Sequence, residues 1–174
     1  MNAVDENGLG ISLIQSNFYG IGSRIGVGNY GFFLHNRGCG FNLIRGHPNN
    51  LGPNKKPLHT LSPTIWSKNG SLEFITGTRG GRYQPQLLAQ TILPYILGES
   101  SFEEIIEKPR WTIEYFGSNT SSNVKFEFLN EPEISRLKEK GHEISVENKL
   151  IGGYGPISTI YKNSDKKFIG VPDI

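Results

Sequence analysis

The residues best suited to chemistry in this sequence are two adjacent glycines, Gly80 and Gly81, in the stretch FITGTRGGRYQP. An apolar run ends just before them and a Gln-Pro pair follows, which indicates a passage from a strand to a helix. Adjacent glycines let the main chain come very close to another group, and one such group is an anion. A tight turn without any chemistry would use the same glycines, so both interpretations stay open.

No other group of residues has the spacing of a metal or cofactor site. The His, Cys and Asp residues do not follow a metal-ligand spacing, and we expect no cofactor. Cys39 is the only cysteine, which excludes an internal disulfide framework. We expect Cys39 to be a small packing residue rather than a nucleophile.

The composition is that of an ordinary globular chain. Its 174 residues, 36% hydrophobic and 20% charged, correspond to one domain with a core of its own. The formal net charge of +2 is too small to indicate nucleic-acid binding. No apolar run approaches the ~18 residues of a membrane span, and no signal peptide is visible. The compartment stays undecided, with the cytoplasm favoured over the alternatives.

Turn residues and alternating apolar residues predict a series of short strands. Asp5–Gly8 has the composition of a hairpin turn, and Asn69-Gly70 is typical of a turn before another strand. Four prolines between residues 45 and 63 indicate an ordered loop. The expected strands are Met1–Val4, Ile11–Ser16, Gly31–Asn36, Leu72–Thr76, Trp111–Tyr115, Val124–Phe128, Glu143–Val146, Ile157–Tyr161 and Phe168–Val171.

Helix signals gather in the middle of the chain. One helix is expected to begin at Pro85, with a kink near its end at Pro94. Ser101 and Glu104 form a capping box for a second helix, and Glu133–Lys140 predicts a third. The apolar face of the first helix should consist of Leu88, Ile92, Tyr95 and Ile96.

Strands and helices in this order predict one α/β unit with a mostly antiparallel sheet. The sequence contains no internal repeat and no linker. We therefore expect residues 1–174 to form a single domain.

Seven short motifs occur in the sequence up to Trp111. They are VDENG, SLIQSN, GIGS, NRGCGF, GPNKKPLHTLSPTI, FITGTRGG and EKPRW, between Val4 and Trp111. In this order they resemble the C-terminal, small subunit of the gamma-glutamyltranspeptidase family. A lone glycine pattern would be far less specific.

The resemblance implies a fold and a reaction. The family has the N-terminal nucleophile hydrolase fold, an α+β four-layer αββα sandwich of antiparallel sheets that a large-subunit partner completes. Its precursor cleaves itself, and the threonine freed at the new N-terminus becomes the nucleophile, with its own α-amine as the base. The implied activity is acyl transfer or hydrolysis at gamma-glutamyl or related amide bonds. Alignment of Val4-Asp5 with the family's first strand places that threonine just upstream of Met1.

Three residues match the catalytic positions of the family. Gly80 and Gly81 match its double glycine, whose N–H groups stabilise the oxyanion of the tetrahedral intermediate. Ser16 matches a hydroxyl residue that hydrogen-bonds to the nucleophile, although an ordinary strand serine is the alternative.

The substrate-binding positions depart from the family pattern. The family holds the substrate's α-amino group with acidic or amide side chains of the segment that matches NRGCGF, which includes Asn36. Arg37 and Gly40 stand in those places here, and an arginine repels an ammonium group but binds a carboxylate. His59 and Thr60 match the paired serines that hold the α-carboxylate. A structural Arg37, paired with an acid of the partner subunit, and a structural loop His59 are the alternatives.

The resemblance also implies partners. We expect a large, N-terminal subunit from the same precursor and a small gamma-glutamyl-type substrate, but no nucleic acid. A dimer of such heterodimers is left open. The alternatives to a gamma-glutamyl enzyme are an acylase for glutaryl or polymeric glutamyl amides and a non-catalytic relative that keeps the pocket for binding.

Overall fold

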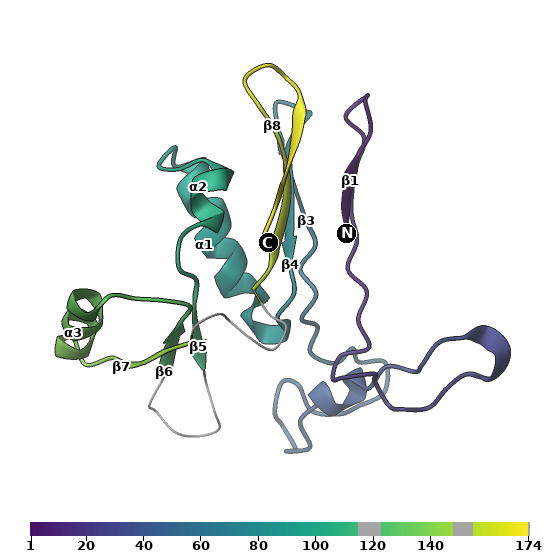
Figure 1. The fold of residues 1–174 in the computed structure, drawn as a ribbon. Helices are drawn as coiled ribbons and strands as arrows, with labels where there is room; N and C mark the ends of the chain where they lie inside the picture. Colours follow the sequence, from purple (N-terminus) through teal and green to yellow (C-terminus); the bar gives the residue numbers. More distant parts are fainter. Residues whose placement is uncertain (115–122, 148–154, 174) are drawn as a thin grey trace. The chain divides into compact units, whose positions relative to one another are not determined.

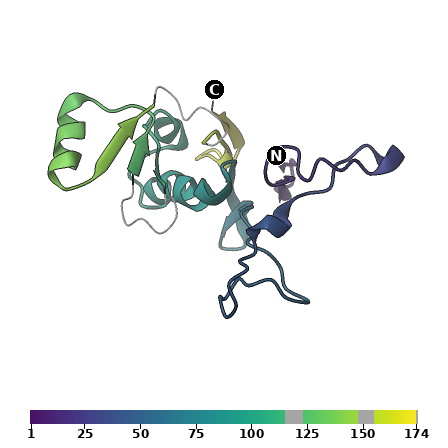
Figure 2. The same cartoon turned by 90° about the horizontal axis from the view of Figure 1, so that it is seen from below.

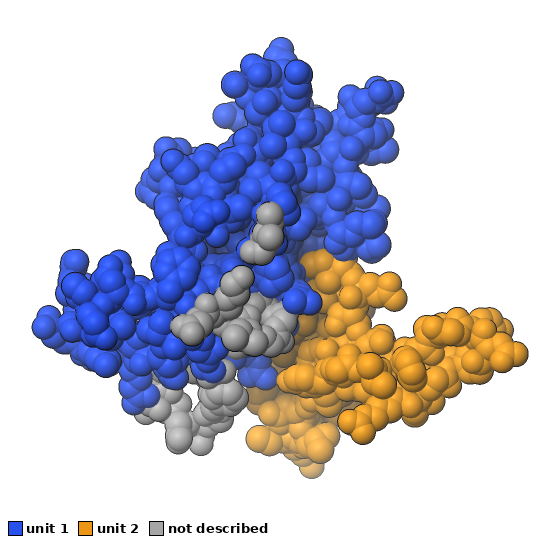
Figure 3. All heavy atoms as spheres, viewed as in Figure 1, with its two compact units in different colours: residues 1–13, 62–174 blue, residues 14–61 orange. Residues whose placement is uncertain are grey.

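The computed structural model describes residues 1–114, 123–147 and 155–173. Contacts divide the chain into two compact units, residues 1–13 with 62–174 and residues 14–61, drawn in blue and orange in Figure 3. We call them the first and the second unit. The single domain expected over residues 1–174 stays a prediction.

Among the described residues, every α-helix and every β-strand belongs to the first unit. Its strands form a two-stranded sheet β1-β2, a four-stranded sheet β3-β4-β8-β9 and a three-stranded sheet β5-β6-β7. Every pair is antiparallel except β6 with β7, so the predicted antiparallel α/β architecture is confirmed. The elements are β1 (Asn2–Val4), β2 (Gly10–Ser12), β3 (Thr64–Lys68), β4 (Ser71–Thr78), α1 (Gln84–Ile96), α2 (Phe102–Ile106), β5 (Trp111–Glu114), β6 (Asn123–Phe126), α3 (Glu131–Glu139), β7 (Glu143–Val146), β8 (Ile157–Lys162) and β9 (Phe168–Pro172).

The core lies between the four-stranded sheet and the helices α1 and α2, which stand beside it in Figures 1 and 2. Phe74 of β4 packs there against Leu88 and Ile92, two residues expected on the apolar face of α1. Phe102 of α2 is fully buried, and its ring centroid is 5.3 Å from that of Phe74. Ile96 is 50% exposed, so the prediction that it belongs to the apolar face of α1 was wrong. The fully buried Leu87 takes part in the core instead.

The opposite side chains of β4 are buried by the β1-β2 hairpin, because neighbouring residues of a strand point to opposite faces. Ile75 is fully buried, and a Cβ built on Gly10 of β2 would lie 2.6 Å from its Cδ1 atom. Glycine at position 10 therefore permits the close approach. Asn2 of β1 donates a hydrogen bond from Nδ2 to the carbonyl of Ser158 in β8, at 2.7 Å. Both faces of β4 are thus covered.

The helix ends follow the sequence signals closely. The capping box of Ser101 and Glu104 is present, with both reciprocal hydrogen bonds. A second box, Asn130 with Glu133, begins α3 at Glu131, two residues earlier than expected. Pro94 lies inside α1, in its last turn.

Two glutamines of α1 cover the open edge of β5. Gln90 Oε1 accepts a hydrogen bond from the N–H of Trp111 at 2.9 Å, and its Nε2 donates to the carbonyl of Trp111 at 2.8 Å. Gln86 Oε1 accepts from the N–H of Ile113 at 2.8 Å. Residues four apart share one face of a helix, so α1 presents these amides like a neighbouring strand. Tyr115, the last residue of the strand expected here, lies outside the described residues.

The second unit is built mainly of turns. All its residues are described, and they form two 3₁₀ turns, Gly28–Tyr30 and Arg37–Gly40, with two isolated β-bridges. The strand expected over Gly31–Asn36 is therefore wrong, because only one bridge, Gly26 with Phe33, forms there. The strand expected over Ile11–Ser16 ends already at Ser12. Both segments are rich in apolar residues but lack a continuous partner strand.

Apolar side chains of the second unit stay largely in solvent. Arg37 is its only buried residue, so this unit has no hydrophobic core in the chain by itself. The exposed large apolar residues are Tyr19, Ile21, Ile25, Tyr30, Phe32, Phe33, Leu34, Leu43, Ile44, Leu51 and Leu58.

Candidate active site

Gly80 and Gly81 lie between the end of β4 and the start of α1, as expected for a strand-to-helix turn. We call residues 79–81 the glycine turn. Gly80 has a φ of 144° and Gly81 a φ of 54°, backbone conformations that glycine adopts with the least strain. Within the described part of the chain, neither N–H group donates a hydrogen bond. Both amides are therefore available to a ligand.

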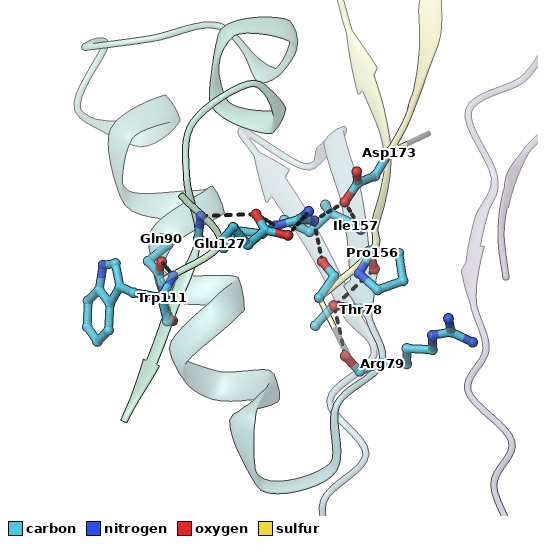
Figure 4. Close-up of polar contacts among 10 residues, drawn as sticks. Thr78, Arg79, Gln90, Trp111, Glu127, Pro156, Ile157 and Asp173 are labelled. Atoms are coloured by element: carbon cyan, nitrogen blue, oxygen red, sulfur yellow. Dashed lines mark hydrogen bonds and ion pairs between the residues drawn. The ribbon is translucent and has the colours of Figure 1, made fainter. Parts of the chain in front are cut away.

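A cluster of charged side chains, Arg110 with Glu127 and Asp173, stands near the same end of the four-stranded sheet (Figure 4). The Arg110 guanidinium donates to both carboxylate oxygens of Glu127 at 2.7 Å, and it also binds Asp173. Burial alone would lower the pKa of Arg110, but the hydrogen bonds and charges of the two acids raise it. Arg110 thus stays charged. The motif EKPRW, which contains Arg110, contributes to the family resemblance, but the sequence pattern assigns Arg110 no role.

In the second unit, Ser16 and Arg37 come together. Arg37 is 7% exposed, and its Nη2 donates to the carbonyl of Ser16 at 3.4 Å. The guanidinium carbon lies 5.2 Å from the ring centroid of Phe18. The Nη1 atom is buried and has no hydrogen-bond partner among the described residues, and no carboxylate pairs with Arg37 there. A buried guanidinium in this state requires an acceptor from outside the chain's described part.

Asn36 uses its whole side-chain amide to shape the loop before it. Its Oδ1 accepts from the N–H of Tyr19 at 3.0 Å, and its Nδ2 donates to the carbonyls of Tyr19 and Gly22 at 3.2 and 3.0 Å. These three bonds use both amide hydrogens. They favour a structural role for Asn36, and its role in substrate binding stays a prediction.

His59 and Thr60 follow a segment that lies against the Arg37–Gly40 turn. A Cβ built on Gly40 would lie 3.4 Å from the Cβ of Leu58, the residue just before His59. His59 is exposed and Thr60 is half-buried. Neither makes a hydrogen bond or ion pair with Ser16, Asn36 or Arg37 among the described contacts. Their carboxylate-binding role stays a prediction.

Two further expectations concern reactive side chains. Cys39 is exposed, so the packing role expected for it was wrong. Among the residues that the structure describes, no group of three or more His, Cys, Asp or Glu side chains is arranged to hold a metal ion. In the same residues, no helix is both long and apolar enough to cross a membrane.

The family model of gamma-glutamyltranspeptidase matches residues 1–174. The chain therefore belongs to the gamma-glutamyltranspeptidase family, and the resemblance seen in its motifs is confirmed at this level. It is 33% identical over 174 residues to the oxamate amidohydrolase proenzyme of Klebsiella pneumoniae, covering 99% of this chain and 33% of that protein. It is 32% identical over 160 residues to a glutathione hydrolase-like proenzyme of Bacillus subtilis, covering 88% of this chain and 29% of that protein. The chain thus spans about a third of the length of these relatives.

Solved structures confirm the fold. Gamma-glutamyltranspeptidase of Helicobacter pylori matches with a TM-score of 0.80 at 22% identity, over 99% of this chain and 97% of that chain. A cephalosporin acylase from Bacillus halodurans matches with a TM-score of 0.76 at 28% identity, over 90% of this chain and 28% of that chain. The expected N-terminal nucleophile hydrolase architecture is therefore present.

Proposed function

We propose that this chain is the small-subunit part of an amide hydrolase or acyltransferase whose acyl group carries a carboxylate and no free α-amine. The observation that carries the proposal is Arg37, a buried guanidinium without a carboxylate partner in the described chain. A substrate carboxylate would supply that partner through charge-assisted hydrogen bonds, whereas an ammonium group would be repelled.

The names of the relatives support this substrate class. Oxamate, named for the Klebsiella relative, carries a carboxylate beside its amide carbonyl and has no α-amine. Cephalosporin acylase, the name of one structural relative, also describes cleavage of an amide. The names that mention glutathione describe a gamma-glutamyl compound with a free α-amine, which is the competing class.

The reaction requires a nucleophile that the resemblance places just upstream of Met1. In the proposed first step, the hydroxyl of an N-terminal threonine bonds to the amide carbon while its α-amine takes the hydroxyl proton. The C–N bond then breaks, and the leaving amine receives that proton. Water next attacks the resulting ester and releases the carboxylic acid and the threonine hydroxyl.

Three residues of this chain have proposed parts in those steps. The N–H groups of Gly80 and Gly81 donate to the carbonyl oxygen when it becomes an oxyanion. Ser16 donates a hydrogen bond to the nucleophile. Its Oγ accepts from the N–H of Phe18 at 3.0 Å, so its own hydrogen is available to donate. His59 and Thr60 are assigned to the carboxylate by resemblance alone.

The proposed partner is a large subunit cut from the same precursor. The word proenzyme in the names of the relatives supports processing, and the exposed apolar residues of the second unit support an extensive partner surface.

A comparison of two substrates tests the proposal. In the complete protein with its upstream segment, kcat/KM is measured for glutaryl and gamma-glutamyl 4-nitroanilides. Wild type should prefer the glutaryl compound, and Arg37→Gln should reduce that preference by about a hundredfold, because it removes the charge that separates carboxylate from ammonium. Arg45→Gln, at an exposed arginine of the same unit, is the matched control.

Two outcomes decide between the interpretations. A wild-type preference for the gamma-glutamyl compound that Arg37→Gln leaves unchanged would make Arg37 structural. A complete, correctly processed protein that turns over neither anilide nor oxamate would contradict the enzymatic proposal itself.

A further inference from the structure

Arg110 joins four separate segments of the first unit through one side chain. Arg110 itself lies just before β5. Its partner Glu127 follows β6, Gly155 precedes β8, and Asp173 follows β9. Its Nη1 donates to the carbonyl of Gly155 at 2.6 Å. Only 14% of the Arg110 side chain is exposed, so these bonds are made largely away from water. Figure 4 shows the cluster between the helices and the end of the sheet.

Gly155 carries this connection to the glycine turn. While its carbonyl accepts from Arg110, its N–H donates to the carbonyl of Arg79 at 3.1 Å. The neighbouring hydroxyl of Thr78 lies 3.0 Å from the carbonyl of Pro156 and 3.1 Å from that of Arg79, and its single hydrogen serves one of them at a time. The contact with Pro156, like the bond from Gly155 to Arg79, joins the end of β4 to the segment before β8.

The carbonyl of Arg79 and the N–H of Gly80 belong to the same peptide group. A trans peptide is planar, and its C=O and N–H bonds point in opposite directions. The described residues contain no cis peptide. The bond from Gly155 to the Arg79 oxygen therefore also fixes the direction of the Gly80 N–H, which the freedom of glycine in φ would otherwise leave variable.

We propose that Arg110 is a positioning residue for the oxyanion-binding amide of Gly80. The chain of contacts runs from the Arg110 guanidinium to the Gly155 carbonyl, from the Gly155 N–H to the Arg79 carbonyl, and through the Arg79–Gly80 peptide plane. This inference rests on the proposed function of Gly80. A lysine in place of Arg110 keeps one positive charge for the acids but lacks the planar fork that binds Glu127 and reaches Gly155 together.

The kinetic test uses Arg110→Lys in the complete protein, with glutaryl 4-nitroanilide as substrate and the active fraction measured by titration with an acylating inhibitor. We expect kcat per titrated site to fall about 10- to 100-fold, with KM within about twofold of wild type. The affinity for a glutaryl-like boronic acid, which forms a tetrahedral anion, should fall by the same factor. Lys125→Met, which breaks a 3.2 Å ion pair with Glu147 in the neighbouring sheet, should change none of these values.

A merely structural Arg110 would give a different pattern. It would lower the melting temperature or the titrated fraction but leave kcat per titrated site and boronic acid affinity within twofold of wild type, and that result would overturn the proposal. If Arg110→Lys does not fold, Asp173→Asn tests the same path, since the amide keeps its size but loses the charge that holds Arg110. It should lower kcat per titrated site in the same direction by a smaller factor, and an unchanged kcat would count against the proposal.

A second measurement does not depend on turnover. In protein labelled with ¹⁵N-glycine, the amide resonances of Gly80 and Gly155 should shift together in Arg110→Lys and stay in place in Lys125→Met. Unmoved resonances in Arg110→Lys overturn the positioning role even in a protein that hydrolyses no amide tested. Shifted resonances in such a protein would support the positioning role while the proposed function fails.

Discussion

The two units of this chain treat their apolar side chains in opposite ways. The first unit buries aromatic and aliphatic residues on both faces of β4, whereas residues 14–61 bury only Arg37. A unit of 48 residues without a buried apolar residue cannot offset its conformational entropy by itself. The second unit therefore depends on a surface beyond its own residues to become ordered.

The chemistry proposed for the two units differs in the same sense. The first unit offers main-chain amides, whose direction is set by hydrogen bonds between β4, β8 and the Arg110 cluster. The second offers a charged side chain, Arg37, whose Nη1 atom has no hydrogen-bond partner among the described residues. In this proposal, the unit with a hydrophobic core carries the amides that must be aimed accurately, and the unit without one carries the group that selects the substrate.

The largest expected effect of this difference is on proteolysis. When the chain is expressed alone, we expect aggregation, and in any soluble fraction cleavage should fall within residues 14–61 long before the first unit is cut. Co-expression with the upstream segment should suppress these cuts by orders of magnitude. Mass spectrometry of the fragments during limited proteolysis gives both rates. An isolated chain that is monodisperse and is cut equally fast in both units would contradict the expected dependence of the second unit on a partner.

A smaller effect is expected on the free energy of unfolding of the assembled protein. Phe102→Ala empties a fully buried position and should cost about 3–5 kcal/mol by denaturant titration. Phe32→Ala changes the same residue type at a position that is 51% exposed in the chain, and it should leave the first unit's transition unchanged. It should instead weaken binding of the partner subunit, which a pull-down at graded concentrations would measure. If both variants lowered the free energy of unfolding equally, the difference in burial between the two units would have no energetic consequence, contrary to our expectation.

The smallest expected effect is on the activation free energy of the reaction and concerns the glycine turn. Gly81→Val forces a β-branched residue into a φ of 54° and should disturb the oxyanion amides, with a loss of about a hundredfold or more in kcat. Gly70→Val is the matched control, since Gly70 has a φ of 75° in a turn at the other end of β4 and open space around it. Precursor processing should be checked in both variants. Near-normal activity in a fully processed Gly81→Val protein would refute the role of the glycine turn.

Much of the first unit could be predicted from sequence because its signals are local. The alternation in Ile157–Lys162 and the Ser101 capping box need no distant partner to be recognised, and both elements formed where expected. The strand Thr64–Lys68 was missed because prolines before it suggested only a loop. Gly31–Asn36 was wrongly predicted as a strand for the opposite reason, since its run of apolar residues lacks a continuous partner strand in the chain.

The candidate site was less accessible to sequence reasoning. The glycine turn and Arg37 were recognised from motifs. Only the structure shows that Arg37 is buried and that its Nη1 atom lacks a hydrogen-bond partner among the described residues. The role of Arg110 was missed because its partners, Glu127, Gly155 and Asp173, are spread over the rest of the chain. One clue was present: Arg110 stands between Pro109 and Trp111 directly at an expected strand, and an arginine that becomes buried there needs acidic partners.

The glutamine pair on α1 restricts how this sequence can change over time. Each position requires a side chain that both donates and accepts, and that reaches the main chain of β5. Glutamate lacks the donor, leucine lacks both groups, and asparagine is shorter by one methylene. Gln86 and Gln90 therefore leave natural variation few alternatives, although neither belongs to the proposed site. At these two positions of α1, the main chain of β5 thus selects glutamine and not merely any polar residue.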